Sequence, residues 1–208
     1  MNIAILVSGG GTNLQAIIDA VENGTLHDVK ICKVIASNRN AYAIQRAEKH
    51  DISVSVISRK DFLEMDAYDN AMLLALQESK TELVVAAGFL SMIGIRVLTA
   101  FPNRVINVHP ALIPAFCGKG MYGIKPHEAA LKKGVKISGA TVHFLNEHYD
   151  EGPIILQKAI DILQNDTPES LQLRIMKECE QVILPQAIQL IADRRVTVID
   201  GRVELRTH

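Results

Sequence analysis

The chain has no tryptophan, only 4% aromatic residues and only three cysteines among its 208 residues. Cys32, Cys117 and Cys179 are far apart and form no Cys-x-x-Cys pair, so the sequence indicates neither a disulfide framework nor a zinc knuckle. No apolar run reaches membrane-spanning length, and no basic segment with a cleavage site precedes the first apolar run. We therefore expect a reduced, cytoplasmic protein with no membrane partner.

An excess of charge is also missing. The chain has 22 Lys and Arg against 23 Asp and Glu, a formal net charge of −1, so nothing in the total favours nucleic-acid binding. Apolar residues at 48% and charged residues at 22% are ordinary for an α/β protein. Repeats, low-complexity tracts and linkers are absent from the sequence, and we expect one domain over residues 1–208.

The first half of the chain alternates apolar runs with segments of helical periodicity. The expected strands are residues 2–7, 29–37, 54–57, 83–87 and 105–109. The expected helices between them begin after the first glycines and cover residues 14–21, 41–50, 61–79 and 93–100, with Asp61 as the cap of the third. Strands that alternate with helices predict a doubly wound, mostly parallel, Rossmann-like α/β sheet with right-handed connections.

The second half of the chain does not continue this regular alternation of strands and helices. A long loop over residues 111–125 leads to a short helix opened by Pro126, and two further strands are expected at 138–144 and 154–162. Thr167 opens a long amphipathic helix to about Arg194, with a kink expected at Pro185, and residues 196–205 form a terminal hairpin.

The glycine loop, Ser8–Asn13, stands between the first strand and its helix. Unpaired N–H groups at a helix start favour an anion, so the loop indicates a phosphate monoester site, with a plain tight turn as the simpler alternative. A dinucleotide fingerprint would need glycine at Leu14 and an acid near Ser37-Asn38, and no Gly-Lys-Ser/Thr follows. Leu6 occupies the glycine position of a nucleophile elbow, so a serine hydrolase is not supported.

Asn107 and His109 share one face of the fifth strand, because side chains alternate along a strand, and Pro110 ends it. The carboxyl-terminal edge of a parallel sheet is where ligands of open α/β folds bind. Taken alone, the pair is better explained as a structural or surface histidine and a turn-forming asparagine. We single it out because of a carboxylate later in the chain.

Asp150 belongs to Asp150-Glu151-Gly152-Pro153, which is also an ordinary turn sequence. A carboxylate beside His109 would raise the pKa of the imidazole and favour a protonated ring near neutral pH. Asn107 could then donate to a developing oxyanion. Because no nucleophilic Ser or Cys accompanies them, these residues suggest direct acyl transfer between two bound substrates. His143 and His148 are interpreted as structural or exposed.

These stretches together resemble the folate-dependent formyltransferases over essentially the whole chain. The motifs that carry the resemblance are Ser8–Asn13, Ala87-Gly88-Phe89, Asn107–Pro114, His127–Leu131 and Asp150–Ile155. Asn-x-His-Pro followed by Asp-x-Gly-Pro is specific for this family, and the glycine loop points within it to enzymes that act on a ribonucleotide.

The resemblance implies transfer of a formyl group from 10-formyltetrahydrofolate to the amine of phosphoribosylglycinamide through a tetrahedral intermediate, without a metal. It implies small-molecule partners and a monomer or homodimer. The implied catalytic residues are Asn107, His109 and Asp150; the implied substrate contacts are Gly11, Thr12 and Asn13 for the phosphate and Glu180 for the ribose; the implied folate contacts are Leu90, Ser91, Met92, Ile93 and Asn107.

Departures from the family pattern leave alternatives open. Met65 and Ser91 stand where the family often has arginine, which leaves Arg59 or Lys60 to contact a folate glutamate tail, and the loop 116–123 is long enough for a lid over the phosphate. The rival functions are formyltetrahydrofolate hydrolase, another formyltransferase such as that for methionyl-tRNA, and a non-catalytic binder of phosphorylated metabolites. The two rival enzymes typically carry an additional domain for which residues 1–208 show no sequence signal.

Overall fold

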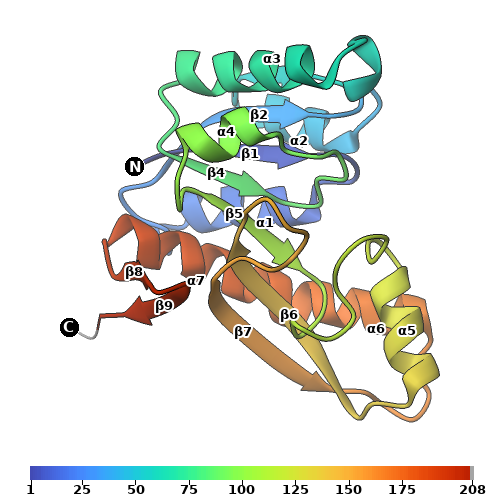
Figure 1. Cartoon of the computed structure of the whole chain (residues 1–208). Helices are drawn as coiled ribbons and strands as arrows, with labels where there is room; N and C mark the ends of the chain where they lie inside the picture. Colours follow the sequence, from blue (N-terminus) through green and yellow to red (C-terminus); the bar gives the residue numbers. More distant parts are fainter. Residues whose placement is uncertain (207–208) are drawn as a thin grey trace. The chain divides into compact units, whose positions relative to one another are not determined.

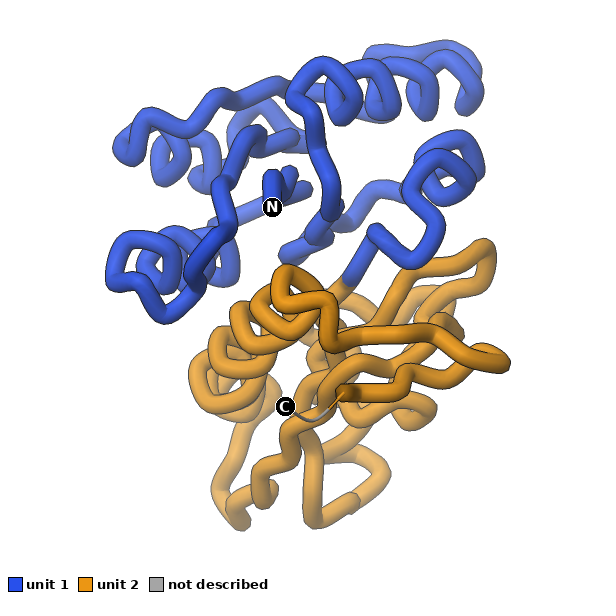
Figure 2. The backbone as a smooth tube through the Cα atoms, turned by 90° about the vertical axis from the view of Figure 1, so that its left-hand side faces the viewer, with its two compact units in different colours: residues 1–106 blue, residues 107–208 orange. Residues whose placement is uncertain are grey.

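The computed structural model describes residues 1–206. The chain divides into two compact units, residues 1–106 and residues 107–208, and each is described by itself (Figure 2). The main sheet has seven strands in the order β3-β2-β1-β4-β5-β6-β7, and a separate two-stranded sheet pairs β8 with β9. The mostly parallel α/β fold predicted from the sequence is confirmed, while its organisation as one domain stays a prediction.

The strands of unit 1 are buried and parallel. β1 (Asn2–Val7) pairs in parallel with β2 (Lys30–Ala36) and with β4 (Leu83–Ala86), and β2 pairs with β3 (Val54–Val56). All four residues of β4 and five of the six in β1 are buried. Continuous apolar runs of this kind are typical of parallel strands covered on both faces.

The helices of unit 1 pack in two pairs, α1 (Thr12–Glu22) with α2 (Tyr42–Lys49) and α3 (Met65–Glu78) with α4 (Ile95–Ala100) (Figure 1). The chain runs from β1 outward to β2 and β3 and then returns to β4 on the other side of β1. Right-handed connections in opposite directions place the two pairs on opposite faces, as a doubly wound sheet requires.

The expected start of the third helix at Asp61 is wrong. Asp61 ends a short 3₁₀ turn, η1 (Arg59–Asp61), and its carboxylate accepts a hydrogen bond from Arg39 at 3.0 Å. The next residue, Phe62, is extended (φ −123°, ψ 135°), so no helix starts at Asp61, and α3 begins four residues later with Glu64 at its N-cap position. The segment between them is irregular.

In unit 2 the parallel pattern gives way to an antiparallel pair. β6 (Ile137–Phe144) pairs with β7 (Ile154–Asp161), and the hairpin of β8 (Val196–Ile199) and β9 (Arg202–Leu205) follows later in the chain. β5 (Val105–His109) ends at the predicted histidine, and α5 (Lys125–Lys133) follows the long loop. These elements agree with the sequence-based expectations to within a residue or two.

The last long helix is interrupted. α6 (Pro168–Ile175) follows its N-cap residue Thr167, whose side chain accepts from the Ser170 N–H in a capping box. A π-helical segment, η2 (Met176–Glu180), then joins α6 to α7 (Gln181–Ala192). The irregularity therefore precedes Pro185 instead of lying at it. Pro185 has no N–H to donate to the carbonyl of Gln181, the first residue of α7, which directly follows the widened turn. No helix within residues 1–206 is both long and apolar enough to cross a membrane.

Candidate active site

The three residues expected to be catalytic all lie in unit 2. Two of them, His109 and Asp150, lie within ion-pair distance of each other. His109 is 4% exposed, and its Nδ1 lies 3.7 Å from Oδ2 of Asp150. Asn107 is on the same strand two residues earlier, so the alternation of side chains puts it on the same face as His109. Asp150 reaches the site from the turn between β6 and β7.

A fourth residue, His143, completes this cluster, and it was interpreted from the sequence only as structural or exposed. Its Nε2 lies 3.3 Å from Nδ2 of Asn107 and 3.6 Å from Oδ1 of Asp150. Its Nδ1 lies 2.9 Å from the Phe144 carbonyl, which only accepts, so Nδ1 carries the proton. In the neutral ring Nε2 accepts from Asn107 and holds that amide in one orientation, whereas in the protonated ring Nε2 donates to Asp150 instead.

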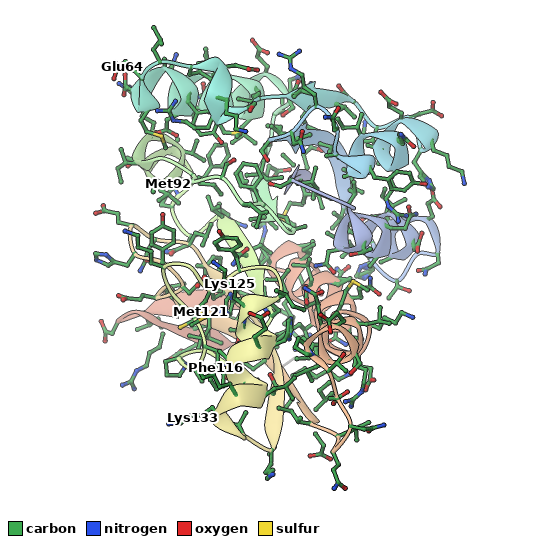
Figure 3. All side chains as sticks on the ribbon, turned by 90° about the vertical axis from the view of Figure 1, so that its right-hand side faces the viewer. Glu64, Met92, Phe116, Met121, Lys125 and Lys133 are labelled. Atoms are coloured by element: carbon green, nitrogen blue, oxygen red, sulfur yellow. The ribbon has the colours of Figure 1, made fainter. Side chains whose placement is uncertain are left out.

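The loop 111–124 supplies backbone groups to the same cluster. The Nε2–H of His109 donates to the Phe116 carbonyl at 2.9 Å, and the Gly118 N–H donates to Oδ2 of Asp150 at 2.9 Å. Phe116 and Asp150 both adopt left-handed backbone conformations, with φ of 52° and 57°. Figure 3 shows Phe116 and Met121 on this loop, before α5. The loop is therefore part of the site as well as a candidate lid.

Buried hydrogen bonds hold the start of this loop. The Thr141 hydroxyl, on β6, donates to the Ala111 carbonyl at 2.7 Å and accepts from the Ile113 N–H at 3.1 Å. Gln157 on β7 donates to the Ile113 carbonyl at 3.0 Å. Because Ala111 is two residues from His109, this network limits where the end of β5 can move.

The charges of the cluster differ from the sequence-based expectation. Burial lowers the pKa of His109; the Phe116 carbonyl and Asp150 raise it, but the net pKa is below the ordinary value. Burial raises the pKa of Asp150, and this is outweighed by the hydrogen-bonding partners His143 and Gly118 and by the two imidazoles, so the net pKa is lowered. The expected raised pKa of His109 is therefore wrong: desolvation exceeds the attraction of one carboxylate. At neutral pH the cluster holds a carboxylate beside a neutral imidazole.

His127 is a second buried histidine of unit 2. It lies on α5, is fully buried, and has no hydrogen-bond partner for either ring nitrogen among residues 1–206. Burial, and then the nearby imidazole of His109, lower its pKa to about 4. His127 is therefore an uncharged ring at neutral pH.

In unit 1 the glycine loop begins α1 as predicted. Gly11 is the N-cap residue with φ of 71°, no side chain caps the helix, and its first turn has no acidic residue. A Cβ on Gly11 would lie 2.6 Å from Cβ of Ala43, so this position excludes larger residues. Thr12 and Asn13 form the first turn of α1, with Asn13 buried. A helix start of this kind favours an anion.

The segment expected to bind folate follows β4 in the same unit. The Leu90 N–H donates to the Ser8 hydroxyl at 2.8 Å, and the Ser8 N–H donates to the Gly88 carbonyl at 3.1 Å. Ser8 thus links the glycine loop directly to the expected folate segment. Leu90 and Met92 are 65% and 54% exposed, and Ser91 and Ile93 are partly exposed, so apolar side chains and backbone face outward here.

The expected substitutes for the missing arginines are placed as follows. Arg59 donates to the Phe62 carbonyl, and Lys60 is exposed on the same short turn. Met65 begins α3. Arg96, which follows the expected folate segment, is held by two hydrogen bonds to Asp66, from Nε at 2.6 Å and from Nη2 at 2.9 Å.

Glu180, expected at the ribose, is 9% exposed and is the last residue of the π-helical segment of unit 2. Segments of this type occur frequently at functional sites. Residues 1–206 contain no group of three or more His, Cys, Asp and Glu side chains that could hold a metal ion.

Known proteins resemble the chain over most of its length. A family model described as formyl transferase matches residues 1–188. The chloroplastic phosphoribosylglycinamide formyltransferase of Arabidopsis thaliana is 35% identical over 195 residues, which are 93% of this chain; the chain spans just under two thirds (66%) of that relative.

Solved structures agree with this. Glycinamide ribonucleotide transformylase 1 from Symbiobacterium toebii superposes with a TM-score of 0.92 at 39% identity, covering 99% of this chain and 93% of that one. A formyltetrahydrofolate deformylase from Pseudomonas syringae pv. tomato shares the fold, with a TM-score of 0.87 at 23% identity over 98% of this chain and 65% of that one. With its sequence motifs, its fold and the match of the family model to residues 1–188, the chain belongs to the formyl transferase family.

Proposed function

We propose that the protein transfers a formyl group from 10-formyltetrahydrofolate to the amine of phosphoribosylglycinamide, a step of purine biosynthesis. The observation that carries the proposal is the cluster of Asn107, His109, His143 and Asp150 at the end of β5. The names of the similar proteins from Arabidopsis and Symbiobacterium support the choice of substrate.

In the proposed reaction, the amine attacks the formyl carbon and a new C–N bond forms. The carbonyl oxygen becomes an oxyanion, to which Asn107 donates through Nδ2. Neutral His109 accepts the proton of the amine; its Nε2–H is already directed to Phe116, and the charge that develops on the ring faces Asp150. The C–N bond to the folate then breaks, and the proton passes to the leaving folate nitrogen.

The binding part of the proposal assigns the phosphate to Gly11, Thr12 and Asn13, and the ribose to Glu180. The folate is assigned to residues 90–93 with Asn107, and we expect it to act as co-substrate without a metal. We also propose a cytoplasmic enzyme acting on small molecules only, as a monomer or homodimer. Support for the phosphate assignment comes from the uncapped, acid-free start of α1.

The test is a two-substrate assay that follows folate absorbance with and without phosphoribosylglycinamide. We expect deformylation to require the ribonucleotide, and His109→Ala to lower turnover by roughly a hundredfold or more, as the loss of a catalytic proton acceptor does. His148→Ala, which removes an exposed imidazole from the same unit, serves as the matched control.

The alternative functions give different results in this assay. Deformylation that is indifferent to the ribonucleotide would indicate a formyltetrahydrofolate hydrolase, whose fold this chain shares. Tight binding of the ribonucleotide without any turnover would indicate a non-catalytic binder of phosphorylated metabolites.

A further inference from the structure

Helix α2 contacts the glycine loop at three points. The Ala43 N–H donates to the Gly9 carbonyl at 3.1 Å, and Nε of Arg46 donates to the Gly10 carbonyl at 2.9 Å. The methyl group of Ala43 also fills the space where Gly11 has no side chain. Two consecutive peptide carbonyls of the loop are thus anchored to one helix.

Anchoring these carbonyls also orients N–H groups. In a planar trans peptide the C=O of one residue and the N–H of the next point in opposite directions. The Gly9 and Gly10 carbonyls point to α2, so the N–H groups of Gly10 and Gly11 point away from it. Successive N–H groups that share a side form a concave anion site, and here they precede the start of α1.

The Arg46 side chain is itself fixed. Its Nη1 donates to Oε1 of Gln15 at 3.1 Å, and Nε2 of Gln15 donates in turn to Oδ1 of Asp19 at 2.8 Å. Its guanidinium lies 5.0 Å from the ring centroid of Tyr42, one turn earlier on α2. Arg46 forms no ion pair with a carboxylate in the part of the chain that the structure describes. A positive charge without a carboxylate partner therefore stands beside the glycine loop.

We propose that Arg46 is a positioning residue for the phosphate site: its guanidinium holds the Gly10 carbonyl turned away from the ligand, and its charge favours a phosphate dianion at the loop. The inference rests on the proposed function for the identity of the ligand, a phosphate monoester. It assigns a role to a residue on α2, outside the motifs that suggested the site.

The experiment compares Arg46→Met, Arg46→Lys and Arg39→Met. We expect Arg46→Met to raise KM for phosphoribosylglycinamide by roughly tenfold or more, with kcat and the KM for the folate changed less than about threefold, because a lost ground-state contact weakens binding. Arg46→Lys keeps the charge but not the two-point guanidinium contact, so we expect an intermediate KM. Arg39→Met removes the same charge from an exposed position of unit 1 that pairs with Asp61, and we expect it to have no effect on KM.

Direct binding separates this inference from the proposed reaction. Calorimetric titration without folate compares the affinities for phosphoribosylglycinamide and for its dephosphorylated form. Arg46→Met should lower only the affinity for the phosphorylated ligand. This result would support the role of Arg46 even in a protein that shows no formyl transfer. An unchanged affinity in Arg46→Met, equal weakening of both ligands, or equal effects of Arg39→Met and Arg46→Met would each overturn it. Should Arg46→Met not fold, Arg46→Lys with wild-type affinity would overturn it as well.

Discussion

The glycine loop of unit 1 and the histidine cluster of unit 2 are two polar sites built in opposite ways. In the glycine loop, the groups offered to a ligand belong to the backbone, and side chains such as Arg46 hold them from behind. In the cluster, the groups offered are side chains, and backbone groups of Phe116 and Gly118 hold them. The comparison suggests that the loop determines binding and that the cluster determines chemistry.

Glycine substitutions should give the largest effects and test this division. A Cβ on Gly152 would lie 1.8 Å from the Phe144 carbonyl, so Gly152→Ala must displace the turn that carries Asp150. We expect kcat to fall roughly a hundredfold, as misplacing a catalytic group by about 1 Å does. Gly11→Ala meets Ala43 and should instead raise KM for the ribonucleotide. Steady-state kinetics, with circular dichroism to confirm folding, measures both; the division fails if both variants change the same constant.

Replacing His143 gives the next largest effect. Without its ring nitrogens, Asn107 loses the partner that orients its amide, so we expect kcat of His143→Leu to fall about 10- to 100-fold with little change in either KM. His143→Gln keeps a hydrogen-bonding group in reach of Asn107 and should retain more activity. Single-turnover rates at saturating substrates measure this. Full activity in His143→Leu would show that the cluster does not need this residue.

His127 should give the smallest effect, on stability alone. Its pKa is about 4 in the folded protein, against 6.5 for an unperturbed histidine, so the unfolded chain binds the proton first as the pH falls. Its contribution to stability is present above pH 6.5 and is lost between 6.5 and 4, by on the order of 1–3 kcal/mol. His127→Leu should lose less stability than the wild type over this window.

Urea unfolding at about pH 7 and at about pH 4.5 measures how much stability the wild type and His127→Leu each lose between these two values. Most of the expected titration of His127 lies between them. His148→Leu, an exposed position in the same unit, is the control and should behave as the wild type. A wild type and a His127→Leu variant with the same dependence on pH would contradict the assignment.

Local sequence patterns predicted the elements whose structure depends mainly on residues close in the sequence. The strand ending at His109, the capping of α6 by Thr167 and the glycine loop before α1 follow from side-chain alternation, capping residues and backbone freedom. The prediction of Asp61 as a cap was wrong because Phe62, directly after it, is extended and α3 starts only at Met65. The capping preference of one residue does not determine the backbone conformation of the residue after it.

The histidine cluster shows the same limit. Asn107, His109 and Asp150 were predicted, but His143 was missed, because its role depends on β6 bringing it beside Asn107. The available signal was that His143 shares a face of the alternating strand 138–144 with Thr141, opposite the apolar Ala140, Val142 and Phe144. The sign of the His109 pKa was missed because burial, which sequence cannot quantify, outweighs the carboxylate.

The π-helical segment that ends at Glu180 has a consequence for how relatives are compared. An α-helix turns by about 100° per residue, so one extra residue accommodated in a widened turn lets the faces of α6 and α7 keep their directions independently. A homologue could gain or lose one residue within 176–180 without reorienting either flank. The residue of a homologue that corresponds to Glu180 therefore has to be identified by superposing the structures. Counting residues along the helix can give a counterpart that is wrong by one position.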